Sequence, residues 1–358
     1  MKKIISILFV LPYILFAQEV IVQFEEKQSW KDIVNKATKK EKYIFVDCYA
    51  TWCQPCKYMD EHVFTQPAVI NILNDRFISW KLQFDKTDSD SQEIQSLYQE
   101  VERFKTDYRV KIFPTYLIFD SYGKLVHRIV GGSDVNVFLS KLSEGLNQES
   151  QYERLIGEFE QSKSNADFLK KLLVQAQKNQ DFLIADQAVE ALVNNLGKEK
   201  VLTPEFIPYI FNSARDSKSY SFDFICMNKS FFDDYLVPQK LNSDLLLSSI
   251  LIYEYVIPQF SDASIQDIDF LKLQTEIENL HPNININSMM MRAKIQYYSS
   301  RQKWSDMVQS ENDYLVLMGD NMNREDIKMY AQILMKGTSD STLQEIAQKW
   351  MRSIEEEI

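Results

Sequence analysis

The sequence predicts an α/β domain followed by an all-α domain. Its 358 residues are enough for two or three domains, and 45% of them are hydrophobic, so a proper core can form. Before position 148, runs rich in β-branched and aromatic residues alternate with segments whose apolar residues recur at helical spacing. After it we find no convincing strand pattern, only amphipathic stretches joined by short polar links.

The elements of the first domain follow one another in a regular order. Ser29 is expected to cap a helix, because its hydroxyl can accept from a free backbone N–H of the first turn. The predicted elements are a helix over 30–40, a buried strand over 43–49, a helix over 57–64, a helix from Pro67 to about Leu73, an alternating strand over 77–84, a helix over 92–105, a strand over 110–120, a hairpin strand over 124–130 and a helix capped by Ser133 that ends near Leu146. This alternation predicts an α/β domain over residues 18–147.

The second domain, residues 148–358, is predicted to be built from helical hairpins. The expected helices span 152–161, 168–178, 182–196, 205–214, 245–255, 268–280, 289–298, 304–317, 324–335 and 343–354. Short links between helices favour antiparallel neighbours. Residues 291–309, and more weakly 167–192, resemble a tetratricopeptide-type helical pair, although the period is irregular. A right-handed solenoid of that type is therefore one expectation for this domain.

The N-terminus has the pattern of a secretory signal peptide over residues 1–17. Lys2 and Lys3 precede an apolar run over 4–16, and Ala17 precedes a polar residue. An uncleaved membrane anchor stays open as an alternative, because Leu15 is large for a cleavage site. We expect an exported protein, and a bacterial periplasm suits it best.

Charge and cysteine content narrow the function classes. The formal net charge is −11 with no basic block, which argues against nucleic acid binding. Four cysteines are too few for the disulfide framework of an exported protein of this size, so they are expected to be chemical rather than architectural. Cys48 and Cys226 lie in apolar surroundings and are expected to be core packing.

Two cysteines two residues apart, in TWCQPC, carry the strongest chemical signal. The pair follows a predicted buried strand and begins a helix. Cys53 at the helix N-terminus would have a lowered thiol pKa and act as an exposed nucleophile, because the helix dipole and free N–H groups stabilise a thiolate. Cys56, one turn later, would resolve the mixed disulfide. Pro55 suits a first helical turn. On spacing alone, a metal clip and a structural staple remain open.

The segment VDCYATWCQPCK is similar to the active-site segment of the thioredoxin family. The extension YMDEHVF, with Pro67 and Val69 after it, looks closer to the exported thiol:disulfide interchange branch of that family. The resemblance covers roughly residues 28–147 and implies a thioredoxin fold, with a central mixed sheet flanked by helices.

The resemblance also implies roles for individual residues. Asp47 would be the buried carboxylate, with a raised pKa, that relays a proton for Cys56. Residues 113–115 match the family's cis-proline loop, in which Phe113, Pro114 and Thr115 would lie against the sulfurs and pair with an extended peptide. Trp52 would form an apolar docking rim, the glycines at 131 and 132 would turn beside the site, and Gln54 with Pro55 would tune the redox potential.

The expected function is that of an enzyme, a thiol–disulfide oxidoreductase acting on protein or peptide disulfides, with the direction of electron flow open. It would use the redox-active Cys53–Cys56 disulfide and no other cofactor. No metal site is expected, since the three histidines are scattered. A membrane-bound electron donor or acceptor would serve it, and the helical domain would bind a protein partner. The alternative is a partner-binding adaptor of the cell envelope whose thioredoxin domain is redox-sensing or vestigial. A thiolate metal carrier is a third reading.

Overall fold

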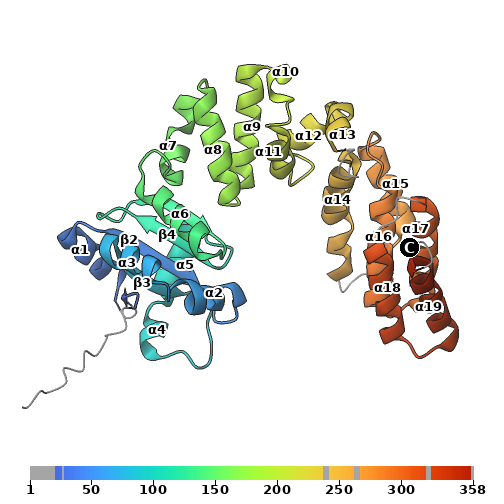
Figure 1. The fold of residues 1–358 in the computed structure, drawn as a ribbon, viewed down its shortest axis with the longest axis horizontal. Helices are drawn as coiled ribbons and strands as arrows, with labels where there is room; N and C mark the ends of the chain where they lie inside the picture. Colours follow the sequence, from blue (N-terminus) through green and yellow to red (C-terminus); the bar gives the residue numbers. More distant parts are fainter. Residues whose placement is uncertain (1–20, 26–27, 237–241, 262–266, 320–323, 356–358) are drawn as a thin grey trace, which may run out of the picture. The chain divides into compact units, whose positions relative to one another are not determined.

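The structure, a computed structural model, describes residues 21–25, 28–236, 242–261, 267–319 and 324–355 (Figure 1). The predicted signal peptide lies outside the described residues. No helix among the described residues is both long and apolar enough to cross a bilayer. The chain divides into two compact units, one of residues up to 160 with 178–180, and one of residues 161–177 and 181–358.

The first unit is built on one mixed five-stranded sheet. Its strands are β1 (Phe24–Glu25), β2 (Tyr43–Tyr49), β3 (Phe77–Gln83), β4 (Thr115–Phe119) and β5 (Leu125–Val130), in the order β1-β3-β2-β4-β5. β3 runs parallel to β1 and β2, whereas β4 is antiparallel to both β2 and β5. β2 is therefore central, and the residues that follow it leave from the middle of the sheet.

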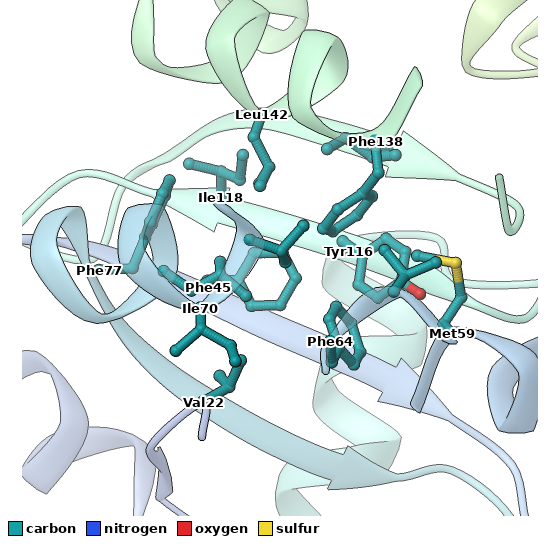
Figure 2. Close-up of a cluster of buried hydrophobic side chains, with 14 residues drawn as sticks. Val22, Phe45, Met59, Phe64, Ile70, Phe77, Tyr116, Ile118, Phe138 and Leu142 are labelled. Atoms are coloured by element: carbon teal, nitrogen blue, oxygen red, sulfur yellow. The ribbon is translucent and has the colours of Figure 1, made fainter. Parts of the chain in front are cut away.

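Helices cover both faces of the sheet. On one face α1 (Trp30–Lys40) and α5 (Tyr98–Asp107) pack on a cluster around Trp80 and Phe119. On the other, the π-helix η1 (Met59–Val63), α3 (Pro67–Arg76) and α6 (Val135–Leu146) enclose a cluster around Phe45 and Tyr116, drawn in Figure 2. The predicted fold class is confirmed for this unit, because buried strands between two helical layers are the observed arrangement.

Several boundaries differ from the predicted ones for local reasons. β1 was not predicted, since a two-residue strand carries no periodic signal. The strand expected over 110–120 is shortened to β4, because the chain before it is a loop that contains the Phe113-Pro114 peptide. The helix expected over 92–105 is two helices, α4 (Gln92–Ser96) and α5, that meet at Leu97. Asp134, not Ser133, caps α6 by accepting from the Val137 N–H.

The first helix after the predicted domain boundary, α7 (Tyr152–Ser162), contacts strand β5. The Tyr152 N–H donates to His127 Nδ1 at 3.0 Å, and Glu153 pairs with the largely buried Arg128. The boundary after residue 147 stays a prediction. A shortened protein made to study the first unit should keep α7, because these contacts bind it to the sheet edge.

The second unit consists of helices among the residues that the structure describes. Its helices are α8 (Ala166–Lys178), α9 (Phe182–Leu196), α10 (Lys198–Val201), α11 (Ile207–Ser213), α12 (Tyr220–Met227), α13 (Lys229–Leu236), α14 (Ser243–Tyr255), the 3₁₀ helix η3 (Ile257–Ser261), α15 (Phe270–Leu280), α16 (Asn287–Ser300), α17 (Trp304–Met318), α18 (Arg324–Gly337) and α19 (Ser341–Glu355). The predicted all-α class is confirmed, and α9 has the predicted bounds. Figure 1 shows α16 beside α17 and α18 beside α19, the pairs with the most extensive mutual contacts. A tetratricopeptide-type repeat stays a prediction.

Carboxylates from one helix cap the start of another in this unit. Asp186 of α9 accepts from the backbone N–H groups of Tyr220 and Ser221 at the start of α12, at 2.9 and 2.7 Å. Asp233 of α13 accepts from the Ser243 N–H at 2.7 Å. Such caps satisfy donors that a helix leaves free at its N-terminus. These contacts join one helix of the unit to the start of another, and sequence spacing does not reveal them.

Candidate active site

The cysteine pair lies at the start of α2 (Gln54–Tyr58), a short turn after the end of β2. Cys53 is the N-cap residue and is joined to Cys56 by a disulfide, with the two Cα atoms 5.3 Å apart. The Cys56 N–H donates to the Cys53 sulfur at 3.2 Å. Pro55 occupies the first turn, where no N–H is needed. The predicted strand-to-helix position of the pair is therefore confirmed.

Both cysteines are buried in the disulfide form, so the expectation of an exposed Cys53 is wrong for this state. Cys53 is 2% exposed and Cys56 is 5% exposed. Tyr49 and Phe113 pack against them. Trp52 is 65% exposed, and its ring meets that of Phe113 edge to face at 5.9 Å. Trp52 thus forms an apolar surface beside a covered disulfide, in agreement with its predicted position.

Asp47 is the buried carboxylate that was expected on the strand before the cysteines. It is 2% exposed, and its Oδ1 has no hydrogen-bond partner among the described residues. Burial raises the pKa of Asp47 to about 7, while the charge of Lys81 lowers this pKa and that of Asp60 raises it. A carboxyl group with a pKa near 7 can both take up and release a proton at neutral pH.

Sequence reasoning missed the two charged partners of Asp47. Lys81 lies opposite Asp47 in the parallel register of β2 and β3, with its Nζ 3.8 Å from Asp47 Oδ2. The same Nζ lies 2.5 Å from Asp60 Oδ1, and Asp60 belongs to the π-helical turn after the cysteines. Alternation along the second strand could have suggested Lys81 once β2 and β3 were paired in register. The π-helical turn that carries Asp60 left no comparable signal in the sequence.

Lys81 also lines a cavity of about 260 Å³ beneath α4. The other residues that line the cavity are Tyr49, Leu82, Gln83, Ser91, Glu93, Ile94 and Leu97. The inner end of the Asp47–Lys81 pair is buried, whereas Asp60 on its other side is more than a third exposed. The charge pair therefore connects the buried carboxylate to more exposed groups.

The predicted proline loop lies beside the cysteine pair. The Phe113-Pro114 peptide bond is cis, as expected. The Thr115 hydroxyl donates to the Ile112 carbonyl at 2.7 Å and closes the loop. Gly131 N–H donates to the Pro114 carbonyl at 2.8 Å, and a Cβ on Gly132 would lie 3.5 Å from Pro55 Cβ. The glycine turn thus approaches the first turn of α2, and exposed Gln54 is left facing solvent.

The segment between β3 and α5 is tied to the turn that precedes the disulfide. Asp85 accepts from the backbone N–H of Thr51 at 3.0 Å and from its hydroxyl. Asp90 accepts from the Thr87 hydroxyl, the Tyr98 hydroxyl, the Thr87 N–H and the Gln83 amide, and these bonds hold its pKa well below the usual range. Figure 1 shows α4 on this segment. The segment is ordered by side-chain contacts rather than by long helices or strands.

The remaining cysteines and histidines are packing or surface residues. Cys48 is fully buried on the face of β2 opposite Asp47, as alternation predicted, and burial raises its pKa well above the ordinary value. Cys226 is only half-buried, so the expected core position is wrong for it. Burial lowers the pKa of His127 to about 4, whereas His62 is exposed. In the described part of the chain, no three His, Cys, Asp or Glu residues group as metal ligands would.

Comparison with known proteins agrees with this geometry. A family model described as a thioredoxin-like domain matches residues 30–145. The chain is 31% identical over 124 residues to the thiol:disulfide interchange protein DsbD of Actinobacillus pleuropneumoniae, covering 34% of this chain and 19% of that one. It is 30% identical over 121 residues to the chloroplastic thioredoxin Y of Oryza sativa subsp. japonica, covering 34% and 61%.

One solved structure is similar over a comparable share of the chain. A solution structure from Bacteroides thetaiotaomicron, described provisionally as that of a disulphide-isomerase, shares 30% identity and covers 37% of this chain and 98% of that one, with a TM-score of 0.31. The chain spans less than a fifth of the DsbD relative and about three fifths of thioredoxin Y. The family match ends at residue 145, before the helical unit begins.

Proposed function

Starting from a chain whose residues 30–145 are a thioredoxin-like domain, we propose that the protein is an exported thiol–disulfide oxidoreductase that acts on protein disulfides. One observation carries the proposal. A disulfide between Cys53 and Cys56 caps a helix at the end of the strand that holds the buried carboxyl of Asp47. A structural staple would have no use for a titrating carboxyl on that strand, whereas a redox centre has.

The dithiol form would reduce a substrate in two exchanges. The Cys53 thiolate attacks one substrate sulfur, so the substrate S–S bond breaks, a mixed disulfide forms and one substrate thiolate leaves. The Cys56 thiolate then attacks the Cys53 sulfur, which releases the second substrate thiolate and forms the Cys53–Cys56 disulfide. Two electrons pass from the protein to the substrate, and the same steps in reverse oxidise a dithiol.

The neighbouring residues supply the proton chemistry and the docking surface. Asp47 takes the proton of Cys56. Because the pKa of Asp47 is about 7, its protonated carboxyl then releases the proton at neutral pH and becomes charged again. The Cys56 N–H donates to the Cys53 sulfur and stabilises its thiolate. Trp52 and the loop of Phe113, Pro114 and Thr115 receive an extended substrate segment, with Gln54 and Pro55 tuning the potential.

The cellular location and the partners of the protein are part of the same proposal. The leader pattern of residues 1–17 supports a role in the bacterial envelope. We place the protein in the periplasm. A membrane-bound thiol protein would reduce or oxidise the cysteine pair after each cycle, since the proposed cycle uses only that pair. The helical unit binds a protein partner.

The reduction potential of the Cys53–Cys56 pair tests the proposal. The full-length mature protein is equilibrated against glutathione or dithiothreitol, with Cys53→Ser as the control. A potential near about −270 mV indicates a reductant, and one above about −180 mV indicates an oxidant or isomerase. Cys56→Ser protein should in addition trap a mixed disulfide with insulin used as a probe.

A pair that forms no reversible disulfide would reject the oxidoreductase. Such a result would leave the envelope adaptor as the function, with the helical unit as its binding part. A reversible pair that neither reduces insulin nor traps it would favour a redox-sensing adaptor over an enzyme of broad substrate range.

A further inference from the structure

Tyr116 is a buried tyrosine that the proposed redox chemistry does not use. Its side chain is fully buried, and its hydroxyl has no hydrogen-bond partner among the described residues. Burying a hydroxyl without a partner is unfavourable, and the large majority of buried polar groups in native proteins are hydrogen-bonded. The place of Tyr116 in the sheet therefore matters, because it indicates which acceptor the hydroxyl can serve.

Tyr116 lies directly opposite Asp47 across strands β2 and β4. The two strands are antiparallel, and their register pairs Asp47 with Tyr116. Side chains that face each other in this way project from the same face of the sheet, with Cβ atoms about 4.5–5.5 Å apart. Asp47 Oδ1 is also without a hydrogen-bond partner among the described residues. An unpaired donor and an unpaired acceptor therefore belong to neighbouring side chains on one buried face.

Aromatic neighbours hold the Tyr116 ring in place. The ring stacks on that of Phe45, with centroids 5.3 Å apart, and meets that of Phe138 at 5.2 Å. Figure 2 shows the hydroxyl of Tyr116 on the side of Met59, which belongs to the π-helical turn η1 after the cysteines. The packing therefore directs the hydroxyl toward the buried region behind the cysteine pair rather than toward solvent.

The charges that act on this hydroxyl come from the same region. Burial raises the pKa of Tyr116 well above its ordinary value, and the negative charge of Asp47, followed by that of Asp60, raises it further. The hydroxyl therefore keeps its proton at neutral pH and is able to donate it in a hydrogen bond. Asp60 already pairs with Lys81 and is partly exposed, whereas Asp47 Oδ1 is buried and lacks a donor.

We propose that Tyr116 is a positioning residue of the redox site, whose hydroxyl donates a hydrogen bond to the carboxylate of Asp47, directly or through one water molecule. The bond holds Oδ1 while Oδ2 faces Lys81, and it favours the charged carboxylate that takes the proton of Cys56. The catalytic part of this inference rests on the proposed oxidoreductase, whereas the hydrogen bond itself does not require the cysteines to react.

The test is Tyr116→Phe, which keeps the packed ring and removes only the hydroxyl. Carboxyl carbon NMR of the oxidised full-length protein follows the titration of Asp47. We expect the pKa of Asp47 to rise by about one unit in the variant, because the charged carboxylate loses a donor. Tyr297→Phe is the matched control. Tyr297 is also buried but lies in the second unit, so its variant should leave the pKa of Asp47 unchanged.

The rate of insulin reduction by the dithiol form gives a second readout. A rise in the pKa of Asp47 from about 7 to about 8 leaves roughly one fifth as much of it charged at pH 7, but nearly the same fraction at pH 9. The Tyr116→Phe rate should therefore fall about fivefold at pH 7 and recover by pH 9, which a merely structural defect would not do. In an Asp47→Asn background, Tyr116→Phe should have no further effect on the rate.

An unchanged pKa of Asp47 in Tyr116→Phe would overturn the inference, and so would an equal loss of rate at pH 7 and pH 9. Neither result bears on the oxidoreductase, whose failure would appear as a wild-type cysteine pair that forms no reversible disulfide. In that case the NMR titration would still decide whether the Tyr116 hydroxyl is bonded to Asp47.

Discussion

Asp47 and Glu311 are two buried carboxyl groups with raised pKa values in different parts of the molecule. Burial raises the pKa of Asp47 to about 7 in the first unit, and burial raises the pKa of Glu311 on α17 to about 8 in the second. Glu311 is fully buried, and neither of its carboxylate oxygens has a hydrogen-bond partner among the described residues. By titration alone the two groups look alike.

Their neighbours differ. Asp47 precedes a disulfide by six residues and touches Lys81, which reaches the partly exposed Asp60. Glu311 lies between α16 and α18, where its pKa is raised further by Asp326 and lowered by Arg292, which pairs with Asp326 at 3.5 Å. A raised pKa therefore marks a catalytic group only where reactive atoms and a path for the proton are close to it.

The largest expected difference between the two carboxyls is in catalysis. Asp47→Asn should slow the release of substrate by Cys56 on the order of 100-fold at pH 7, because Asn cannot take the thiol proton. Glu311→Gln should leave that rate unchanged. The measurement is the rate of insulin reduction by each variant, together with its pH profile. An Asp47→Asn protein that matches the wild type would remove Asp47 from the mechanism.

The sequence was informative about Asp47 and silent about Glu311 for a physical reason. Asp47 lies in a strand–turn–helix whose residues are close in sequence, so both the local sequence pattern and the family resemblance identify it. Glu311 is buried by α16 and α18 through side chains that meet only after the helices pack. Alternation along β2 likewise predicted the opposite faces of Asp47 and Cys48.

The difference between local sequence patterns and tertiary packing also explains the wrong predictions within the first unit. Lys81 and Asp60 reach Asp47 through strand register and a π-helical turn, and neither is a local pattern. The exposure expected for Cys53 failed because Tyr49 and Phe113 come from outside the motif to cover it. The cysteine spacing predicts the chemistry of the pair, while its accessibility depends on tertiary packing.

The next prediction compares how the folding stability of the wild type and of Glu311→Gln depends on pH. The folded pKa of Glu311, about 8, lies above its ordinary value of 4.5, so the folded state holds a proton that the unfolded chain has lost. Wild-type stability should therefore fall as pH rises from about 5 to 8, and Glu311→Gln should avoid that loss. We expect the variant to gain about 2 kcal/mol or more at pH 9 relative to pH 5.

Thermal unfolding of both proteins at the two pH values measures this gain. An equal difference in melting temperature at pH 5 and pH 9 would mean that Glu311 does not titrate in the folded protein over that range.

Smaller changes are expected when the partners of Asp47 are altered. Lys81→Met should raise the pKa of Asp47 above about 7, because the nearby positive charge is lost. Asp60→Asn should lower the pKa of Asp47, since it removes a nearby negative charge and leaves the ammonium of Lys81 paired with Asp47. Each shift should be about one unit, read from carboxyl carbon NMR of the oxidised protein. Shifts of the same sign in both variants would contradict the opposite effects of Lys81 and Asp60 on the pKa of Asp47.

The smallest effect is expected at Cys226, the half-buried thiol of the helical unit. Burial raises the pKa of Cys226 to about 11, so at pH 8 roughly one molecule in a thousand carries the thiolate that reacts. Iodoacetamide should therefore label Cys226 slowly in the oxidised protein, and after mild reduction it should label Cys53 first, as mass spectrometry of the peptides would report. Cys226→Ser should leave the reduction potential unchanged. A shifted potential would mean that the helical unit takes part in the redox chemistry, and the division between the two units would have to be redrawn.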